Sequence, residues 1–263
     1  MNRSGSHRLR KAIQDKRPAI GLYAELGPVA IELMGYCGLD YVVVDMEHTS
    51  VDLLTIEKMV ATASLTGLSL LVRVRRNDYG TALTALDIGA NGVVFPHVNT
   101  KQDALAAVAA TKYEPIGKRG YSRPRKTIVE QTDGLTYTKQ TNEDVILMPL
   151  IEEPEGVRNI DEILSVEGID VIDTGPGDLS YSLGVPSKYQ SPKLLEALEK
   201  VYDACAKKKM PFSIIFSYYP EQVRKYVNKE FSLLVDLHDD EGIFVDNLKV
   251  QLANIKSVVE RPR

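Results

Sequence analysis

Titratable side chains gather at the ends of apolar runs in this sequence. The run "YVVVDMEHTS" starts with an apolar stretch and ends with Asp45, Glu47 and His48. Arg73 lies near the end of the run "SLLVRV", and Glu152 closes "VILMPLIE". A strand that is covered on both faces favours apolar residues along its length, and buried polar groups are costly there. Polar groups that are confined to the strand ends therefore indicate a functional site.

These residue types suit the chemistry of a 2-oxo acid. Glu152 and Asp178 are carboxylates from distant parts of the chain, and such a pair suits Mg²⁺ or Mn²⁺, which keep water or substrate oxygens as further ligands. His48 with Asp45 has the composition of a general-base pair. Arg73 is a permanent cation that could stabilise an oxyanion. The stretch "GPGD" precedes a helical segment, so its amides could bind a small carboxylate. Together these groups predict enolisation of a 2-oxo acid.

Short apolar runs alternate with helical segments along the chain, and this alternation indicates how the polar groups are positioned. Helical periodicity is clear in 51–67, 99–113 and 191–208, the first ending at Gly67, a plausible cap, and the others beginning with Asn or Ser. Buried strands are predicted over 19–26, 41–47, 69–74, 92–98, 145–152, 170–176, 211–217 and 231–237.

Eight strand–helix units in 263 residues predict the α/β class and a single (β/α)₈ TIM barrel. We expect residues 1–263 to form one catalytic domain, because no linker or change in composition divides them. The Gly-x-Gly-x-x-Gly turn of an open dinucleotide-binding sheet is absent after the first predicted strand. In a barrel the C-terminal strand ends form one face, so the polar groups should meet there.

Composition excludes several classes of protein. A formal net charge of −4 argues against nucleic-acid binding. No apolar run approaches the roughly 20 residues of a membrane helix, and the basic N-terminus lacks the apolar segment of a secretory signal. The two cysteines, Cys37 and Cys205, are too few and too far apart for a disulfide framework or a metal site. We expect two buried thiols in a cytoplasmic protein.

Six motifs follow one another in a recognisable order between residues 40 and 183: "VVDMEH", "LVRVRRND", "ALDIGANGVVFPHV", "KYEPIGKRGYS", "PLIE" and "DTGPGDLS". In these motifs the sequence resembles the HpcH/HpaI family of class II pyruvate aldolases, which includes the hydroxy-oxo-heptanedioate and 2-keto-3-deoxyglucarate aldolases. "DMEH" together with "GPGDLS" is the most specific pair. The resemblance implies a barrel of the phosphoenolpyruvate/pyruvate-domain type.

The resemblance also implies a reaction and an assembly. The reaction is reversible aldol cleavage of a 4-hydroxy-2-oxo acid to pyruvate, or a close 2-oxo acid, and an aldehyde. It uses a divalent metal, Mg²⁺ or Mn²⁺ with Co²⁺ as a further option, and no Schiff-base lysine. The assembly is a homo-oligomer, typically a hexamer or trimer of dimers, with the last helix exchanged between neighbours. The apolar segment 242–259 could instead pack within its own subunit.

The motifs allow the roles of family residues to be assigned to particular positions of this sequence. The resemblance implies that Glu152 and Asp178 are the metal ligands. It implies that His48 is the catalytic base, with Asp45 as its partner, and that Asp87 is a further acid of the proton-handling network. The family role of Glu47 is unassigned.

Substrate contacts are implied in the same way. Arg73 matches the arginine that holds the keto or enolate oxygen. The amides of Gly177 and Asp178 match those that bind the pyruvate carboxylate. Arg119 falls within the family-like "KRGY" and is expected to contact substrate. The basic run 117–126 could form a lid that attracts an anionic acceptor or a distal carboxylate, but Arg125 and Lys126 are expected to be solvated.

The sequence departs from the family pattern in the acceptor half of the site. Leu150 stands where glutamine is common, and Tyr23 stands where tryptophan often lines the pocket. The segment "LLVDLHDDEGIFVDN" is also unusual, and we expect His238 with Asp239 and Asp240 to lie in a solvated loop.

Because of these departures, the sequence does not determine the identity of the substrate. Alternative functions are a decarboxylase or C–C bond-forming enzyme acting on oxaloacetate, a CoA-thioester lyase of the citrate lyase β type, and a non-catalytic relative. Two further polar residues are considered. His97 could either line the site or be a hydrogen-bonded histidine of the core, and Asp173 is expected to be structural.

Overall fold

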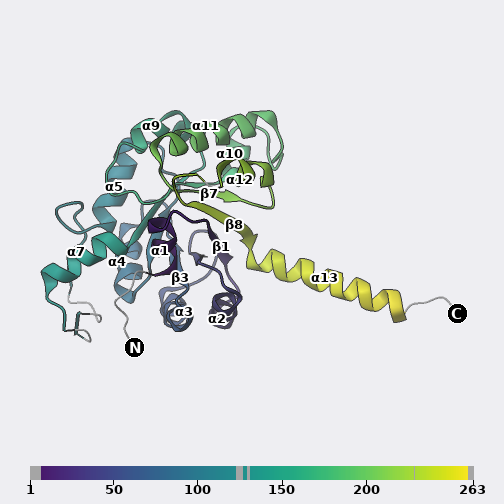
Figure 1. Cartoon of the computed structure of the whole chain (residues 1–263), viewed down its shortest axis with the longest axis horizontal. Coiled ribbons are helices and arrows are strands. Elements are labelled where there is room, and N and C mark those ends of the chain that lie inside the picture. The colour runs from purple at the N-terminus through teal and green to yellow at the C-terminus, as the bar shows by residue number, and fades with distance from the viewer. Residues whose placement is uncertain (1–6, 123–126, 129–130, 228, 260–263) are drawn as a thin grey trace.

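The computed structural model describes residues 7–122, 127–128, 131–227 and 229–259. Its centre is a barrel of eight parallel strands, in the order β6-β5-β4-β3-β2-β1-β8-β7 (Figure 1). The strands are β1 (Ala19–Ala24), β2 (Tyr41–Asp45), β3 (Ser69–Arg73), β4 (Gly92–Phe95), β5 (Ile146–Ile151), β6 (Asp173–Thr174), β7 (Phe212–Ile215) and β8 (Leu233–Asp239). The predicted (β/α)₈ TIM barrel is confirmed, and each predicted strand overlaps an observed one.

The strand β6 is much shorter than the predicted run 170–176. Ile172 forms only an isolated parallel bridge to Phe212 of β7, and this bridge brings the two ends of the sheet together. After Thr174 the chain turns at once into the helix α10 (Pro176–Ser182). The barrel is therefore nearly closed, and its weakest seam lies between β6 and β7.

Alternate residues of the strands face two different layers of the core. Val42 and Val44 pack outward against the helices, whereas Tyr41 and Val43 belong to the interior of the barrel. This division explains why the strand sequences are apolar at successive positions. Leu9 of the N-terminal helix α1 (Arg8–Gln14) also joins the interior cluster, so α1 covers one end of the barrel.

The boundaries of two helices in the described part of the chain can be compared directly with the sequence predictions. The helix α3 (Leu53–Thr66) ends at Gly67, which has the left-handed φ of 74° that favours glycine. The helix α5 (Lys101–Thr111) is capped by Thr100 and not by the predicted asparagine, because Thr100 and Asp103 form a capping box. The remaining helices are α2 (Pro28–Cys37), α4 (Tyr79–Ile88), α7 (Gly134–Asp144), α8 (Pro154–Arg158), α9 (Ile160–Ile163), α11 (Pro192–Lys208), α12 (Pro220–Tyr226) and α13 (Asp240–Val259).

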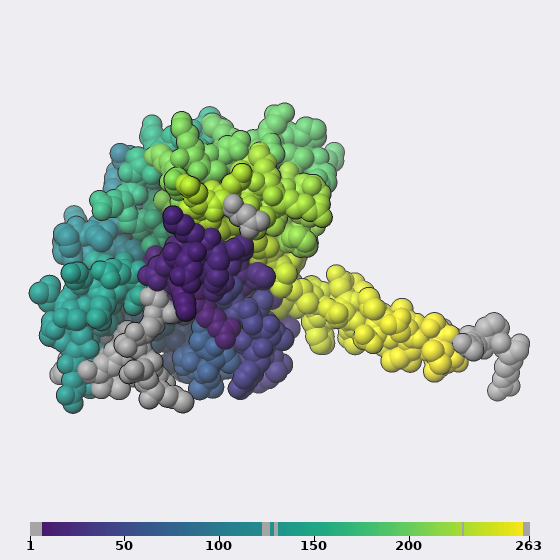
Figure 2. Space-filling model, in the orientation of Figure 1, coloured from purple at the N-terminus to yellow at the C-terminus, as the bar shows by residue number. Residues whose placement is uncertain are grey.

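The last helix, α13, projects from the barrel into solvent (Figures 1 and 2). Only its first residue, Asp240, is buried. Its apolar side chains are exposed, including Phe244, Leu248 and Ile255. No described helix is long and apolar enough to cross a membrane.

The cysteines differ in environment. Both are free thiols in the structure, but only Cys205 is buried, whereas Cys37 is exposed at the end of α2. The expectation of two buried thiols is therefore wrong for Cys37, because it lies on the solvent side of its helix.

Candidate active site

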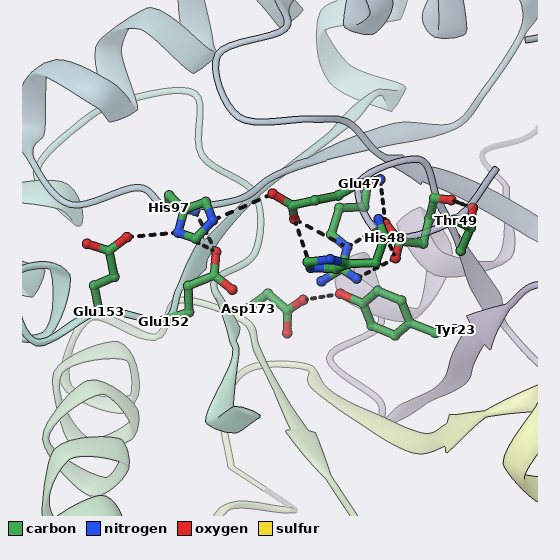
Figure 3. A network of polar contacts seen from close by, with 10 residues as sticks. Tyr23, Glu47, His48, Thr49, His97, Glu152, Glu153 and Asp173 are labelled. Carbon is green, nitrogen blue, oxygen red and sulfur yellow. Dashed lines mark hydrogen bonds and ion pairs between the residues drawn. The ribbon is translucent and has the colours of Figure 1, made fainter. Parts of the chain in front are cut away.

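A cavity of about 310 Å³ opens among the C-terminal ends of the strands. Its lining includes five predicted site residues, contributed by the ends of the three strands β2, β3 and β5 and by α10: His48, Arg73, Glu152, Gly177 and Asp178. This location agrees with the general placement of active sites in such barrels. Figure 3 shows the polar network on this side of the barrel.

Arg73 and Asp45 form the best-defined pair of the network. Nε of Arg73 donates to Oδ1 of Asp45 at 2.8 Å, and Nη2 donates to Oδ2 at 2.6 Å. The strands β2 and β3 are parallel neighbours, and their register pairs Asp45 with Arg73, so the two residues lie side by side. Burial disfavours the charged carboxylate, but the hydrogen bonds and charge of Arg73 outweigh burial and lower the pKa of Asp45. The pair thus holds the guanidinium at the cavity wall.

His48 is not paired with Asp45 through its ring, so that part of the expectation is corrected. Asp45 accepts a hydrogen bond from the backbone N–H of His48 at 3.3 Å, and its carboxylate is already occupied by the guanidinium of Arg73. The imidazole Nε2 of His48 instead lies 3.7 Å from Oε2 of Glu47, and the side chain is 60% exposed. The acid beside the candidate base is therefore Glu47.

Glu47 is a central member of the network that its family resemblance left without a role. One carboxylate oxygen lies 3.5 Å from Nε2 of His97, and the other lies 3.8 Å from Nε of Arg73. That second oxygen is buried and has no hydrogen-bond partner. A buried unpaired carboxylate oxygen is costly and usually marks a missing partner, such as an ion or water.

His97 belongs to the network, and its backbone is strained. Its φ is 56°, in the left-handed region that non-glycine residues seldom adopt. The backbone N–H of His97 donates to Oε1 of Glu152 at 2.7 Å, and Nδ1 lies 2.8 Å from Oε1 of Glu153. His97 therefore supports the carboxylates beside the cavity without lining it, and Glu153 is a network residue that the strand pattern did not identify.

Glu152 has the environment of a cation ligand. Its side chain is only 1% exposed. Burial, together with the nearby negative charges of Asp178 and Glu47, raises its pKa to about 8. A divalent cation at this position would stabilise the charged carboxylate of Glu152 against both burial and the neighbouring negative charges. The described residues contain no cluster of three His, Cys, Asp or Glu that could hold a metal, so a metal here would need water or substrate oxygens beside Glu152 and Asp178.

The glycine turn before Asp178 is fixed by close packing against Glu152. A Cβ on Gly175 would lie 2.7 Å from Cβ and 2.8 Å from Oε2 of Glu152, so no larger residue fits without displacing this carboxylate. A Cβ on Gly177 would meet nothing within 4 Å, which shows open space beside its backbone. The turn thus approaches Glu152 closely and leaves room for a small ligand.

Asp87 and Arg119 are joined to each other and do not line the cavity. Nη2 of Arg119 donates to Oδ1 of Asp87 at 2.7 Å, and the guanidinium lies 4.7 Å from the ring centroid of Tyr113. The side chain of Arg119 is fully buried. Their expected roles in proton handling and substrate binding stay predictions. Within the basic run 117–126, residues 123–126 lie outside the described residues.

Tyr23 and Leu150, two of the departures from the family pattern, both line the cavity. The Tyr23 ring lies 5.0 Å below the guanidinium of Arg73, and its hydroxyl donates to Asp173 at 2.9 Å. Leu150 is nearly fully buried and adds an apolar surface beside Glu152. Tyr23 therefore connects the cavity to the barrel interior.

Asp173 and Asp236 form an acidic pair beneath the cavity, which gives a prediction for pH dependence. Tyr41 donates to Asp236 at 2.5 Å, and Ser213 donates to Asp173. Burial, aided by the charge of Asp173, raises the pKa of Asp236 to about 8, and burial also raises the pKa of Asp173.

The folded protein therefore binds protons more tightly than the unfolded chain, in which an aspartate has a pKa of about 3.9. The contribution of this pair to stability is fully present below that value and is lost as pH rises through about 8. We expect the unfolding temperature of the metal-free protein to fall between about pH 6 and about pH 9. Asp236→Asn should flatten this decline, whereas Asp161→Asn, at an exposed position, should not. An equal decline in all three proteins would contradict this origin.

The family model "HpcH/HpaI aldolase/citrate lyase" matches residues 20–237. The chain belongs to this family. Among its relatives, a 5-keto-4-deoxy-D-glucarate aldolase of Escherichia coli is 30% identical over 90% of this chain and 92% of its own. A hydroxypyruvate/pyruvate aldolase of Rhizorhabdus wittichii is 35% identical over 68% of this chain and 70% of its own.

Solved structures of the HpcH/HpaI family have the same fold. An HpcH/HpaI aldolase from Desulfitobacterium hafniense superposes with a TM-score of 0.86 at 27% identity, covering 98% of this chain and all of that one. The citrate synthase SbnG superposes with a TM-score of 0.84 at 25% identity, covering 95% of this chain and 97% of its own. The solved structures that resemble this chain therefore include both an HpcH/HpaI aldolase and a citrate synthase.

Proposed function

We propose that this chain is a carbon–carbon lyase that cleaves a 4-hydroxy-2-oxo acid reversibly into pyruvate, or a close 2-oxo acid, and an aldehyde. Aldolase-named relatives that match most of the chain support this activity. The observation that carries the proposal is one cavity that holds the buried carboxylate of Glu152, the carboxylate of Asp178 and the guanidinium of Arg73. We place the activity in a single catalytic domain, residues 1–263.

Glu152 and Asp178 would hold a divalent cation, Mg²⁺ or Mn²⁺, with Co²⁺ as a further option. The raised pKa of Glu152 and the unpaired oxygen of Glu47 nearby support a cation in this region. When bound, such a cation supplies Lewis-acid polarisation of the 2-oxo group. The open backbone at Gly177 leaves its amide and that of Asp178 available to a carboxylate of the substrate.

His48 and Arg73 would manage the proton and the developing charge. His48 is exposed to the cavity and would accept the proton of the C4 hydroxyl, with Glu47 stabilising the imidazolium. The C3–C4 bond then breaks, the aldehyde leaves, and the electron pair remains on the enolate of pyruvate. Arg73, held by Asp45, would stabilise the enolate oxygen, and protonation at C3 then yields pyruvate.

Release of pyruvate tests this proposal directly. The protein is freed of metal by a chelator, and a 4-hydroxy-2-oxo acid is supplied with and without Mg²⁺ or Mn²⁺. We expect metal-dependent release of pyruvate and aldehyde in equal amounts. Release that is unaffected by the chelator would contradict the metal-dependent mechanism.

A second candidate function is C–C bond formation on oxaloacetate, favoured by the similarity to the citrate synthase SbnG. The same pyruvate half of the site would serve either reaction. Consumption of oxaloacetate without activity on any hydroxy-oxo acid would favour this candidate, or a decarboxylase or a CoA-thioester lyase. No metal binding in a calorimetric titration would favour a non-catalytic relative.

We further propose that the protein is a homo-oligomer, such as a hexamer, in which α13 packs on a neighbouring subunit. Its exposed residues Phe244, Leu248, Leu252, Ile255 and Val259 recur at helical spacing and form one apolar stripe. An apolar stripe of this kind is typical of an interaction surface. A cytoplasmic location stays a prediction.

Charge on the stripe should break the oligomer. Leu248→Asp combined with Leu252→Asp is expected to reduce the mass measured by analytical ultracentrifugation to that of one chain, because two carboxylates would be buried without partners. Lys249→Asp with Lys256→Asp, on the same helix, tests whether charge alone has this effect. An unchanged mass in the leucine variant would contradict the role of α13.

A further inference from the structure

Three residues at the β7 and β8 side of the cavity form a connected polar group that the proposed reaction does not use. The hydroxyl of Tyr218 lies 2.7 Å from Nε2 of His238, and Nδ1 of His238 pairs with Oδ2 of Asp239. All three residues line the same cavity as Glu152 and Arg73. The expectation of a simple solvated loop at His238 is therefore not met.

The backbone of β8 is distorted where it carries these side chains. Gly21 and Tyr23 of β1 are two residues apart, but their partners Asp236 and Asp239 on β8 are three apart, so β8 contains one extra residue. His238 within this bulge has a φ of 143°, which is rare for a residue with a side chain. Bulges next to active sites typically redirect a side chain, and strained backbone is concentrated at such sites.

Aromatic packing fixes the position of Tyr218. Its ring stacks on Tyr189, with centroids 4.2 Å apart and planes 10° apart, and the ring of His238 meets it edge-on at 5.2 Å. Gln190 also donates to the backbone carbonyl of Tyr218 at 2.7 Å. These contacts come from the connection before α11, the segment after β7 and the bulge of β8. They hold a hydroxyl and an imidazole at the cavity in one orientation.

The charges on this side of the cavity are acidic. Among the described lining residues, Arg73 is the only lysine or arginine, and it is already paired with Asp45. Glu25 and Asp239 also line the cavity, after β1 and at the end of β8, and the described lining holds no lysine or arginine besides Arg73. Burial and nearby carboxylates, including Glu241, raise the pKa of Glu25. A second substrate that carries a carboxylate would meet repulsion here.

We propose that Tyr218, His238 and Asp239 form the subsite for the aldehyde, and that this subsite selects a neutral, hydroxyl-bearing aldehyde over one that carries a carboxylate. The inference rests on the proposed aldolase function and adds the chemical class of the second substrate. Both ring nitrogens of His238 are engaged, so the imidazole orients the phenol of Tyr218, whose oxygen can still accept a hydrogen bond from a substrate hydroxyl. The Tyr189–Tyr218 stack provides a flat wall for a short carbon chain.

Three two-carbon aldehydes separate the contributions of hydroxyl and charge. Pyruvate addition is measured with glycolaldehyde, acetaldehyde and glyoxylate in the metal-loaded enzyme. We expect kcat/KM for glycolaldehyde to exceed that for acetaldehyde by about tenfold, the effect of one or two hydrogen bonds, and to exceed that for glyoxylate by at least about tenfold. Equal or greater kcat/KM for glyoxylate would overturn the proposed selectivity.

Variants of the subsite residues test whether these residues cause the selectivity. Tyr218→Phe and His238→Gln should each reduce the preference for glycolaldehyde over acetaldehyde by several fold. A general loss of folding would lower both rates and leave their ratio unchanged. Tyr219→Phe is the matched control, because Tyr219 is the next residue, is buried with an unpaired hydroxyl and does not line the cavity. An unchanged ratio in both subsite variants would overturn their assignment.

Failure of this inference can be told from failure of the aldolase proposal. Exchange of pyruvate methyl protons with heavy water requires no aldehyde. If the wild-type enzyme exchanges these protons and prefers glyoxylate, only the acceptor inference fails. If it neither exchanges them nor adds any of the three aldehydes, the proposed function itself fails.

Discussion

Glu152→Gln is expected to weaken Mg²⁺ or Mn²⁺ binding by at least about a hundredfold, because loss of even a residue that supports a ligand costs 10–100-fold. Glutamine preserves the shape of the side chain and can still accept from the N–H of His97, but it lacks the charge that a hard cation requires. It also removes one of several crowded carboxylates, so the metal-free variant should be at least as stable as the wild type. Calorimetric metal titration and thermal unfolding measure the two effects.

The matched control for Glu152→Gln is Glu155→Gln. Glu155 lies three residues further on, at the exposed start of α8, and does not line the cavity. It should bind metal like the wild type. Wild-type affinity in Glu152→Gln would contradict the assignment of Glu152 as a ligand.

Arg73→Lys is expected to lower kcat for aldol cleavage by about a hundredfold or more, in the range found when a group that stabilises an oxyanion is removed. Lysine keeps the positive charge but lacks the planar fork that engages both oxygens of Asp45. The cation would therefore lose its fixed position over Tyr23 and beside the cavity. The loss should fall mainly on kcat, because an enolate is present only after the reaction has begun.

Arg75→Lys provides the control for this change. Arg75 is exposed just beyond the end of β3 and does not line the cavity. It should keep the wild-type kcat. If Arg73→Lys raised KM and left kcat unchanged, Arg73 would be a group that binds the ground state and not one that stabilises the enolate.

The barrel could be predicted from sequence because apolar runs buried on both faces are distinctive. The predicted strand 41–47 matches β2 closely, and Asp45, Arg73 and Glu152 lie near the strand ends as expected. The predicted run 170–176 exceeds β6, because the pattern of apolar residues does not record where hydrogen bonding to a neighbour stops. The cavity and the cluster around Glu152 followed from the barrel rule once the strands were assigned.

Side-chain partners could not be predicted in the same way. Asp45 was expected beside the ring of His48, but the neighbouring strand brings Arg73 to it, and a guanidinium fork matches a carboxylate better than an imidazole does. The link between Tyr218 and His238 joins the segment after β7 to the bulge in β8, whereas His238 was expected in a solvated loop. Neither the residue types nor their spacing encode this bulge.

The central claim is that the chain enolises pyruvate with a divalent metal. Its most direct test is proton exchange in heavy water, followed by NMR of the pyruvate methyl group, in protein that has been freed of metal and then supplied with Mg²⁺ or Mn²⁺. We predict loss of the methyl proton signal only when metal is present, and a much slower loss in Glu152→Gln. Persistence of the signal with every metal would contradict the claim.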